Sequence, residues 1–137
     1  MKGIYILVIE LPADGEINTL KKKFTLSKGF YMYVGSAMNN LEARVKRHLS
    51  KSKKQHWHID FLLDRARIKA VFLAQTEAKQ ECQLAGQFAR LKSAHNFGCS
   101  DCRCYSHLFF GESESALRGS ALQGFIAIGL EPLEQAI

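Results

Sequence analysis

The pattern of apolar positions along the chain predicts a mixture of strands and helices. A nearly continuous apolar run rich in β-branched residues covers residues 3–11, and it predicts a strand buried on both faces. Shorter runs bounded by turn residues predict further strands at 24–26, 30–34, 68–74 and 104–110. Apolar residues at helical spacing predict helices at 39–49, 56–65, 76–92 and, more weakly, 112–128. This order is typical of an α/β (α+β) domain whose helices pack on a sheet.

Local signals define some of these elements more closely. Residues 27–29, Ser-Lys-Gly, predict a hairpin turn between the second and third strands. Asn39 resembles an N-cap, with Glu42 three residues later as a capping box, and Thr76 is expected to cap the helix at 76–92. The first helix is expected to bury a stripe that consists of Leu41, Val45 and Leu49. Arg44 and His48 then lie one turn apart on the flank of that stripe.

Length and composition exclude several classes of protein. With 137 residues, of which 47% are apolar and 23% charged, the chain has the material for a single globular domain, 1–137. No apolar run approaches the roughly 18 residues that a membrane span needs, so no membrane partner is expected. The start of the chain lacks a small-residue cleavage site, and we therefore expect a cytoplasmic protein with reduced thiols.

The charge distribution points to a polyanionic partner. The net charge is +6, and every Lys and Arg except Arg118 precedes residue 112. The stretch from Arg44 to Lys54 contains six Lys or Arg and no acid. A basic patch of this kind favours a nucleic acid, although a solvated helix face would give the same pattern. The predicted nucleic-acid contacts are Arg47, Lys51, Lys53 and Lys54.

Three ordered motifs resemble the GIY-YIG nuclease superfamily. They are Gly3-Ile4-Tyr5, Tyr33-Val34-Gly35-Ser36-Ala37 and Leu41-Glu-Ala-Arg44-Val-Lys-Arg-His48. The stretches His56-Trp-His-Ile-Asp60 and Phe97-Gly-Cys-Ser-Asp-Cys102-Arg-Cys-Tyr-Ser-His107-Leu are similar to one small subfamily of unknown function. The resemblance covers a core of about residues 3–110, which leaves 112–137 as a helical tail.

The resemblance implies a fold and a chemistry. The implied fold has a central three-stranded antiparallel sheet flanked by helices. The implied activity is divalent-metal-dependent hydrolysis of phosphodiester bonds. Carried over by position, the implied catalytic residues are Tyr5, Tyr33, Arg44, His48 and Glu81. Glu81 is also the implied ligand of one Mg²⁺ or Mn²⁺ ion, and we prefer it to Glu77, one helical turn earlier.

These residue types suit phosphodiester cleavage. Arg44 can clamp phosphate oxygens, and a tyrosine can orient or deprotonate water if positive neighbours favour its phenolate. Which tyrosine does so is not fixed by the sequence. We expect a DNA endonuclease, and the alternatives are a catalytically silent nucleic-acid-binding module and a zinc-stabilised adaptor. Because no separate targeting domain is visible, specificity is expected from a partner protein, a homodimer or the shape of the substrate.

Two departures from the superfamily pattern concern the substrate pocket. Ser36 stands where several relatives carry Lys. The Pro-x-Tyr-Asn segment that follows the glutamate helix in relatives is missing, and Asn96 or the pair Ser100-Asp101 are candidates to replace its asparagine.

The remaining candidate ligands are cysteines and histidines. The spacing Cys99-x-x-Cys102-x-Cys104-x-x-His107 offers four zinc ligands, but structural zinc sites usually join two separated pairs. We therefore expect reduced, partly buried thiols in place of a structural zinc site. His56 and His58 flank Trp57, and we expect one packed and one functional histidine there.

Overall fold

A computed structural model describes residues 1–51, 53–99 and 102–137. Within these residues five strands form one sheet, in the order β6-β4-β1-β5-β7, with every neighbouring pair antiparallel. The strands are β1 (Gly3–Leu11), β4 (Gly29–Ala37), β5 (Arg67–Gln75), β6 (Leu108–Gly111) and β7 (Leu133–Gln135). The α+β class is thus confirmed, but the expectation of a three-stranded central sheet is wrong, because β6 and β7 extend the sheet at its two edges.

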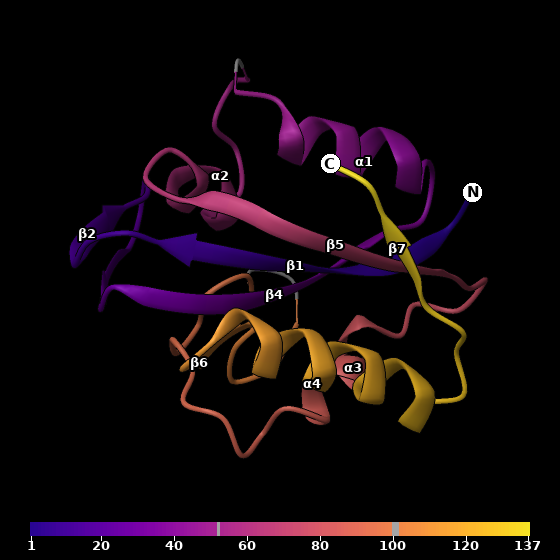
Figure 1. The fold of residues 1–137 in the computed structure, drawn as a ribbon. Coiled ribbons are helices and arrows are strands. Elements are labelled where there is room, and N and C mark those ends of the chain that lie inside the picture. The colour runs from indigo at the N-terminus through magenta and orange to yellow at the C-terminus, as the bar shows by residue number, and fades with distance from the viewer. Residues whose placement is uncertain (52, 100–101) are drawn as a thin grey trace.

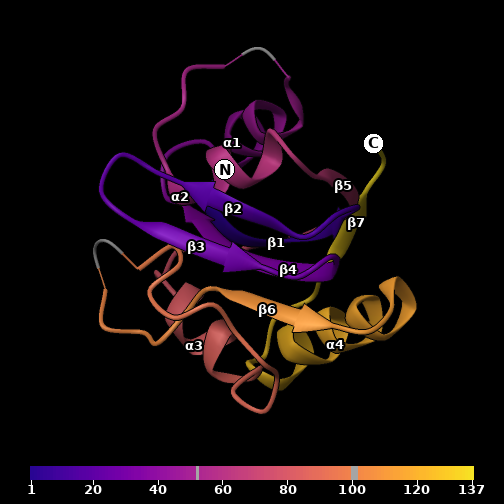
Figure 2. The same cartoon turned by 90° about the vertical axis from the view of Figure 1, so that its left-hand side faces the viewer.

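Helices cover both faces of this sheet, so the molecule has three layers (Figures 1 and 2). Helices α1 (Leu41–Leu49) and α2 (His58–Leu63) lie on one face, which we call the upper layer. Helices α3 (Glu81–Gly86) and α4 (Glu114–Ala127) lie on the other, the lower layer. The central strand β1 alternates between them: Tyr5, Leu7 and Ile9 belong to the upper core, and Ile4, Ile6 and Val8 to the lower core. The strand is therefore buried on both faces, as the apolar run predicts.

A small separate sheet corrects the hairpin expected at residues 27–29. β3 (Lys23–Leu26) pairs with β2 (Gly15–Asn18) and not with β4. Gly29, the first residue of β4, has a φ of 147°, which is a conformation that favours glycine. The buried residues Ile17, Phe24 and Leu26 join the upper core, so this ribbon extends that core beyond the main sheet.

Helix α1 begins one residue later than the sequence predicts. The side-chain oxygen of Asn40, and not that of Asn39, accepts the backbone N–H of Ala43 at 3.0 Å. From Leu41 onward the buried positions are Leu41, Val45 and His48, which follow the i, i+4, i+7 spacing of a helix face. His48 therefore points into the protein, while Leu49 is only half-buried.

The helix expected at 76–92 is much shorter. The hydroxyl of Thr76 accepts the N–H of Ala78 at 3.3 Å and bonds Gln80 Oε1 at 2.6 Å, so it stabilises a turn in place of a helix start. Regular helix begins only at Glu81 and ends at Gly86, after which i→i+3 bonds continue the chain as turns. Glu81 is consequently in the first turn of α3, and Glu77 lies outside the helix.

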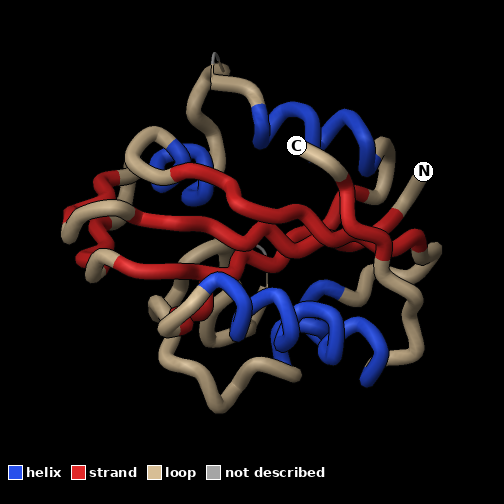
Figure 3. Tube along the Cα trace, in the orientation of Figure 1, coloured by secondary structure: helices blue, strands red, loops and turns tan. Residues whose placement is uncertain are grey.

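The C-terminal segment contributes to both the sheet and the lower core. Its helix, α4, covers most of the predicted span 112–128 and buries Leu117, Ala121 and Phe125 against the sheet. The strand β7 then pairs with β5, an arrangement that the tube in Figure 3 also shows. No helix in the described part of the chain is long and apolar enough to cross a membrane.

Candidate active site

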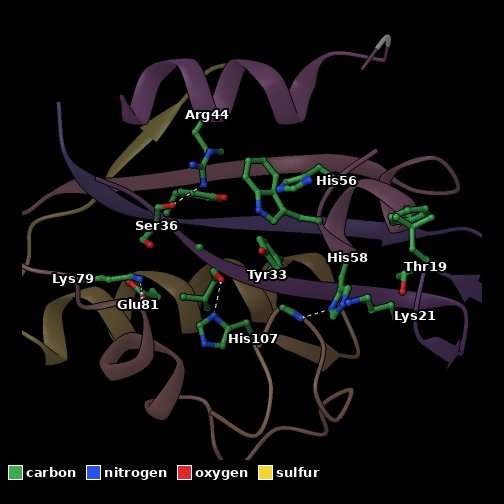
Figure 4. A pocket seen from close by; sticks show the side chains of 17 residues that line it. Thr19, Lys21, Tyr33, Ser36, Arg44, His56, His58, Lys79, Glu81 and His107 are labelled. Carbon is green, nitrogen blue, oxygen red and sulfur yellow. Dashed lines mark hydrogen bonds and ion pairs between the residues drawn. The ribbon is translucent and has the colours of Figure 1, made fainter. Parts of the chain in front are cut away.

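A cleft of about 490 Å³ lies along β4, between the upper layer and α3 (Figure 4). Four of the five candidate catalytic residues line it, although they come from four different elements: Tyr5 from β1, Tyr33 from β4, Arg44 from α1 and Glu81 from α3. In Figure 4 Arg44 approaches from the upper layer and Glu81 from the lower layer. The fold thus brings together residues that are up to 76 positions apart in the sequence.

The first tyrosine is held by a cross-strand glycine. Tyr5 pairs directly with Gly35 in the β1–β4 ladder, and only 1% of its surface is exposed. A Cβ atom at position 35 would lie 2.4 Å from both Cζ and Oη of Tyr5. Any side chain at position 35 would therefore displace the ring, which explains why a glycine follows the Tyr33-Val34 pair.

The fifth candidate, His48, lies next to Tyr5. Its Nε2 is 2.6 Å from Tyr5 Oη, and only 2% of His48 is exposed. Burial lowers the pKa of His48 to about 3, so the imidazole is neutral at physiological pH. Burial also raises the pKa of Tyr5 and that of Tyr33 above the usual value for a phenol. We therefore assign Tyr5 as a protonated phenol that donates to Nε2 of a neutral His48.

Two contacts fix the guanidinium of Arg44. Its Nη1 donates to the backbone carbonyl of Ser36 at 2.9 Å, and its Cζ lies 4.3 Å from the centroid of the Trp57 ring. Ser36 thus contributes to the cleft through its backbone carbonyl. A planar guanidinium held over an indole in a cleft is well placed to bind phosphate oxygens.

Arg47, a predicted DNA contact, is engaged within the protein. Its guanidinium donates to both carboxylate oxygens of Asp60, at 2.8 and 2.9 Å, and to the carbonyl of Lys54 at 2.8 Å. Its Cζ also lies 4.5 Å from the centroid of the Trp57 ring. The buried Asp60 additionally accepts the backbone N–H groups of His56 and Trp57. The His56–Asp60 motif is therefore explained by a hydrogen-bonded hub around Asp60.

The electrostatics of this hub are favourable to the ionised carboxylate. Burial alone would raise the pKa of Asp60, but the hydrogen bonds from Arg47 and from two backbone N–H groups outweigh it and lower that pKa. Asp60 is thus a fixed negative charge behind the cleft.

The three predicted lysine contacts differ in their surroundings. Lys51 and Lys54 are exposed, whereas Nζ of Lys53 donates to the carbonyls of His48 and Ser50 at 3.2 and 2.5 Å at the end of α1. Lys53 therefore caps a helix C-terminus. Lys51 and Lys53 also line a second hollow, of about 710 Å³, together with Arg65 and Arg67. This hollow lies outside the tyrosine-lined cleft.

Glu81 has the environment expected of a ligand for a hard cation. It is 8% exposed and lines the cleft, and its Oε2 has no hydrogen-bond partner among the described residues. Its Oε1 lies 3.9 Å from Nζ of Lys79. A buried carboxylate oxygen without a partner is costly unless a cation compensates it, and Mg²⁺ and Mn²⁺ prefer such oxygens. The exposed Glu77 does not line the cleft, so the residues present fit one metal ion at Glu81.

Other polar residues of the cleft have less specific sequence signals. His56 is exposed with its ring against Trp57, while His58 is half-buried and its Nδ1 accepts the N–H of Gly98 at 2.9 Å. Lys21 and Lys79 also line the cleft and escape sequence reasoning, because an isolated lysine carries no spacing signal.

The two candidates for the missing asparagine do not enter the cleft lining. Asn96 has a φ of 67°, and its N–H donates to the carbonyl of Tyr105 at 2.7 Å within the loop before β6. Ser100 and Asp101 lie outside the described residues. No described residue can therefore be matched to that asparagine by its position.

A second cluster of potential ligands lies beneath the cleft. The side-chain donor atoms of Cys82, Cys102, Cys104 and His107 all lie within 4.8 Å of one another, and this set could hold a metal ion. The sequence spacing offers Cys99 for such a set, and we expect no structural zinc site from it, whereas in the structure Cys82 of α3 completes the set and Sγ of Cys99 contacts the carbonyl of Phe97. The four donors thus come from α3 and from the loop before β6, and not from one short loop. Three thiols and an imidazole suit zinc better than Mg²⁺ or Mn²⁺.

The fold and the cleft define a three-layered α+β protein with a pocket built from two tyrosines, an arginine and a glutamate. Residues 4–128 match the model of a protein family described as "Domain of unknown function DUF123", and the chain belongs to this family. Searches of curated proteins and of solved structures gave no match. The family description names no activity, so the resemblance to GIY-YIG nucleases stays a prediction.

Proposed function

We propose that this protein is a GIY-YIG-type endonuclease that hydrolyses phosphodiester bonds of DNA with the help of one divalent metal ion. The observation that carries the proposal is the convergence of Tyr5, Tyr33, Arg44 and Glu81 on one cleft. A module that only binds nucleic acid needs cations but does not need a buried carboxylate with an unpaired oxygen in the same cleft as two phenols. That combination suits a reaction at phosphorus.

In this proposal the upper layer binds the phosphate and orients the attacking water. Arg44, oriented by Ser36 and Trp57, contacts two oxygens of the scissile phosphate. Tyr5 directs its own proton toward His48 Nε2, so a lone pair of its oxygen remains for a water molecule in the cleft. As that water attacks phosphorus, Tyr5 Oη accepts a hydrogen bond from it and orients it, while the phenolic proton stays on Tyr5 because the pKa of His48 is about 3. The proton lost by the attacking water passes to solvent in the cleft. Tyr5, rather than Tyr33, is the tyrosine that orients water, because His48 Nε2 at 2.6 Å fixes the direction of its hydroxyl.

The lower layer supplies the site for the metal. Glu81 would hold one Mg²⁺ or Mn²⁺ ion through Oε2, and such an ion supplies positive charge that stabilises a departing alkoxide. Lys21 and Lys79, also in the cleft lining, are suited to contact flanking phosphates.

The proposal also covers DNA contacts outside the cleft, partners and the cellular location. The exposed cations Lys51 and Lys54 would contact the DNA backbone beyond the cleft, and a partner protein or a homodimer would add specificity. A cytoplasmic location, in which thiols remain reduced, agrees with four free cysteines.

The test is an incubation of the purified protein with supercoiled, linear, branched and single-stranded DNA. Each substrate is incubated with Mg²⁺, with Mn²⁺ and with excess EDTA. We expect cleavage of at least one substrate with either ion and none in EDTA. Full activity in EDTA would remove Glu81 from its proposed role. Tight DNA binding without any cleavage would favour the silent binding module.

A further inference from the structure

We propose that Cys82, Cys102, Cys104 and His107 form a structural zinc site that fastens α3, and with it Glu81, to the sheet. This inference does not rest on the proposed function, because its test measures metal content. The four donors come from two separated parts of the chain: Cys82 from α3, and the other three from the loop before β6. A structural zinc site likewise joins separated segments of a chain, although two pairs are more usual than the one donor and three donors found here.

The distances match those of a tetrahedral site. Zn–S bonds of about 2.3 Å and Zn–N bonds of about 2.0 Å at tetrahedral angles place sulfur and nitrogen roughly 3.5 Å apart. His107 Nε2 lies 3.7 Å from Cys82 Sγ and 3.6 Å from Cys102 Sγ. With all four donors within 4.8 Å of one another, a small contraction gives the full geometry.

The outer hydrogen bond of His107 also agrees with metal binding. Its Nδ1 lies 3.1 Å from the backbone carbonyl of Val34, a group that can only accept, so Nδ1 carries the proton. Nε2 then presents its lone pair toward the sulfurs. Histidines that bind metals usually donate their other ring N–H to a carbonyl or carboxylate in this manner. His107 is buried, and it connects the cluster directly to β4.

The surroundings of the cluster explain why such a site would be needed. Helix α3 has only six residues, too few to be stable without tertiary contacts. The loop before β6 carries no regular structure in its described residues 94–99 and 102–107. The sulfurs are not joined by disulfides, since each of the four cysteines, all of them described, is free. Because Cys82 directly follows Glu81, a bond between Cys82 and zinc would fix the carboxylate that faces the cleft.

The first experiment measures metal in the full-length protein purified without chelators and without a histidine tag. Elemental analysis should find stoichiometric zinc, and replacement by Co²⁺ should give the visible absorption bands of a tetrahedral thiolate site. The proposed zinc site is overturned if the zinc concentration is a small fraction of the protein concentration and Co²⁺ gives no such bands. Stoichiometric iron without zinc would overturn the choice of metal.

Variants then locate the ligands. Cys82→Ser and Cys102→Ser should lose most of the zinc and unfold at lower temperature, while Cys99→Ser should retain both zinc and stability. If the ligand variants do not fold, release of zinc from the wild-type protein during cysteine modification still tests the site. Retention of zinc by Cys82→Ser with loss by Cys99→Ser would replace Cys82 with Cys99 in the proposed set.

Discussion

The two sides of the cleft are stabilised in different ways. On the upper side the polar groups are paired within the protein: Tyr5 with His48, Arg44 with the Ser36 carbonyl and Arg47 with Asp60. On the lower side one oxygen of Glu81 has no partner among the described residues, and three thiols crowd around His107. The exception on the upper side is Nδ1 of the buried His48, which has no hydrogen-bond partner among the described residues. The lower side instead has ligand sets that call for cations.

This difference assigns separate tasks to the two layers. In the proposed function the upper layer binds phosphate and orients water, tasks that need a fixed geometry, and its paired network is suited to give one. Groups that bind metals gain their geometry from the ion, so their surroundings are less regular. Substitutions on the two sides should therefore have different effects. We expect loss of metal-dependent cleavage on the lower side and loss of stability on the upper side.

The largest effect is expected on the lower side, at Glu81. Glu81→Gln keeps the size of the side chain but removes the charge, so DNA cleavage at saturating Mg²⁺ or Mn²⁺ should fall about a thousandfold or more while DNA binding survives. The matched control is Glu77→Gln, which should keep most of the activity because Glu77 is exposed and outside the cleft lining. Both rates are measured side by side. The opposite ranking would move the metal to Glu77.

The second largest effect is a loss of stability on the upper side. Arg47→Met leaves the buried carboxylate of Asp60 without its bidentate partner, and this should cost about 3 kcal/mol in the free energy of unfolding. Urea denaturation at neutral pH measures it, with Lys46→Met on the exposed side of α1 as the control. An equal and small cost for both variants would contradict the structural role of Arg47.

Asp60 also gives the Arg47 experiment a pH dependence. The pKa of Asp60 is lower in the folded than in the unfolded protein, so its stabilisation is present above the unfolded pKa near 3.8 and is lost as the pH falls through the folded value. The wild-type advantage over Arg47→Met should therefore shrink below about pH 4.

A third effect concerns His48 and appears at mildly acidic pH. Because the folded pKa is about 3 and the unfolded value 6.5, the unfolded state binds a proton that the folded state excludes between these pH values. Stability should therefore fall by up to about 1.4 kcal/mol per unit as the pH drops below 6.5. Replacing His48 by Gln should flatten this slope, whereas replacing the exposed His56 by Gln should not. Thermal unfolding at intervals from pH 7 to pH 4 provides the comparison.

The smallest effect is expected at the exposed cations. The double variant Lys51→Gln/Lys54→Gln should fold normally, bind DNA more weakly and reduce the slope of log affinity against log salt by up to about 2. Arg90→Gln/Lys92→Gln removes two exposed cations of the lower layer and should leave the slope unchanged. Lys53 is omitted because its ammonium caps α1. A wild-type affinity that does not respond to salt would exclude this picture.

The sequence predicts the strongly patterned elements and misses those that depend on tertiary context. The apolar run of β1 and the helical periodicity of α1 define these elements from local signals alone, whereas α4 has a weaker pattern. The short edge strand β7 carries no alternation that stands out, since it reads Leu-Glu-Gln. For α3, local hydrogen bonds of Thr76 compete with the helical periodicity and delay its start to Glu81.

The same distinction holds for the candidate site. The ordered motifs name Tyr5, Tyr33 and Arg44, and these residues do share a cleft. Spacing alone offers a four-ligand set with Cys99 on one loop, which we set aside as a zinc site, while the packing of α3 brings Cys82 to the other three donors. Cys82 was the one cysteine remote from the others in the sequence, and the preference of zinc sites for separated ligands could have singled it out.

The contact of Trp57 with two guanidinium groups gives the protein an intrinsic fluorescent probe of its cleft. Trp57 is the single tryptophan of the chain, and the Arg44 and Arg47 carbons lie 4.3 and 4.5 Å from its ring. A phosphate that draws Arg44 away from the indole changes the electric field across the chromophore, so occupancy of the cleft can be followed by intrinsic fluorescence without any label. Arg47, held by Asp60, stays in place and provides the constant background against which that signal is read.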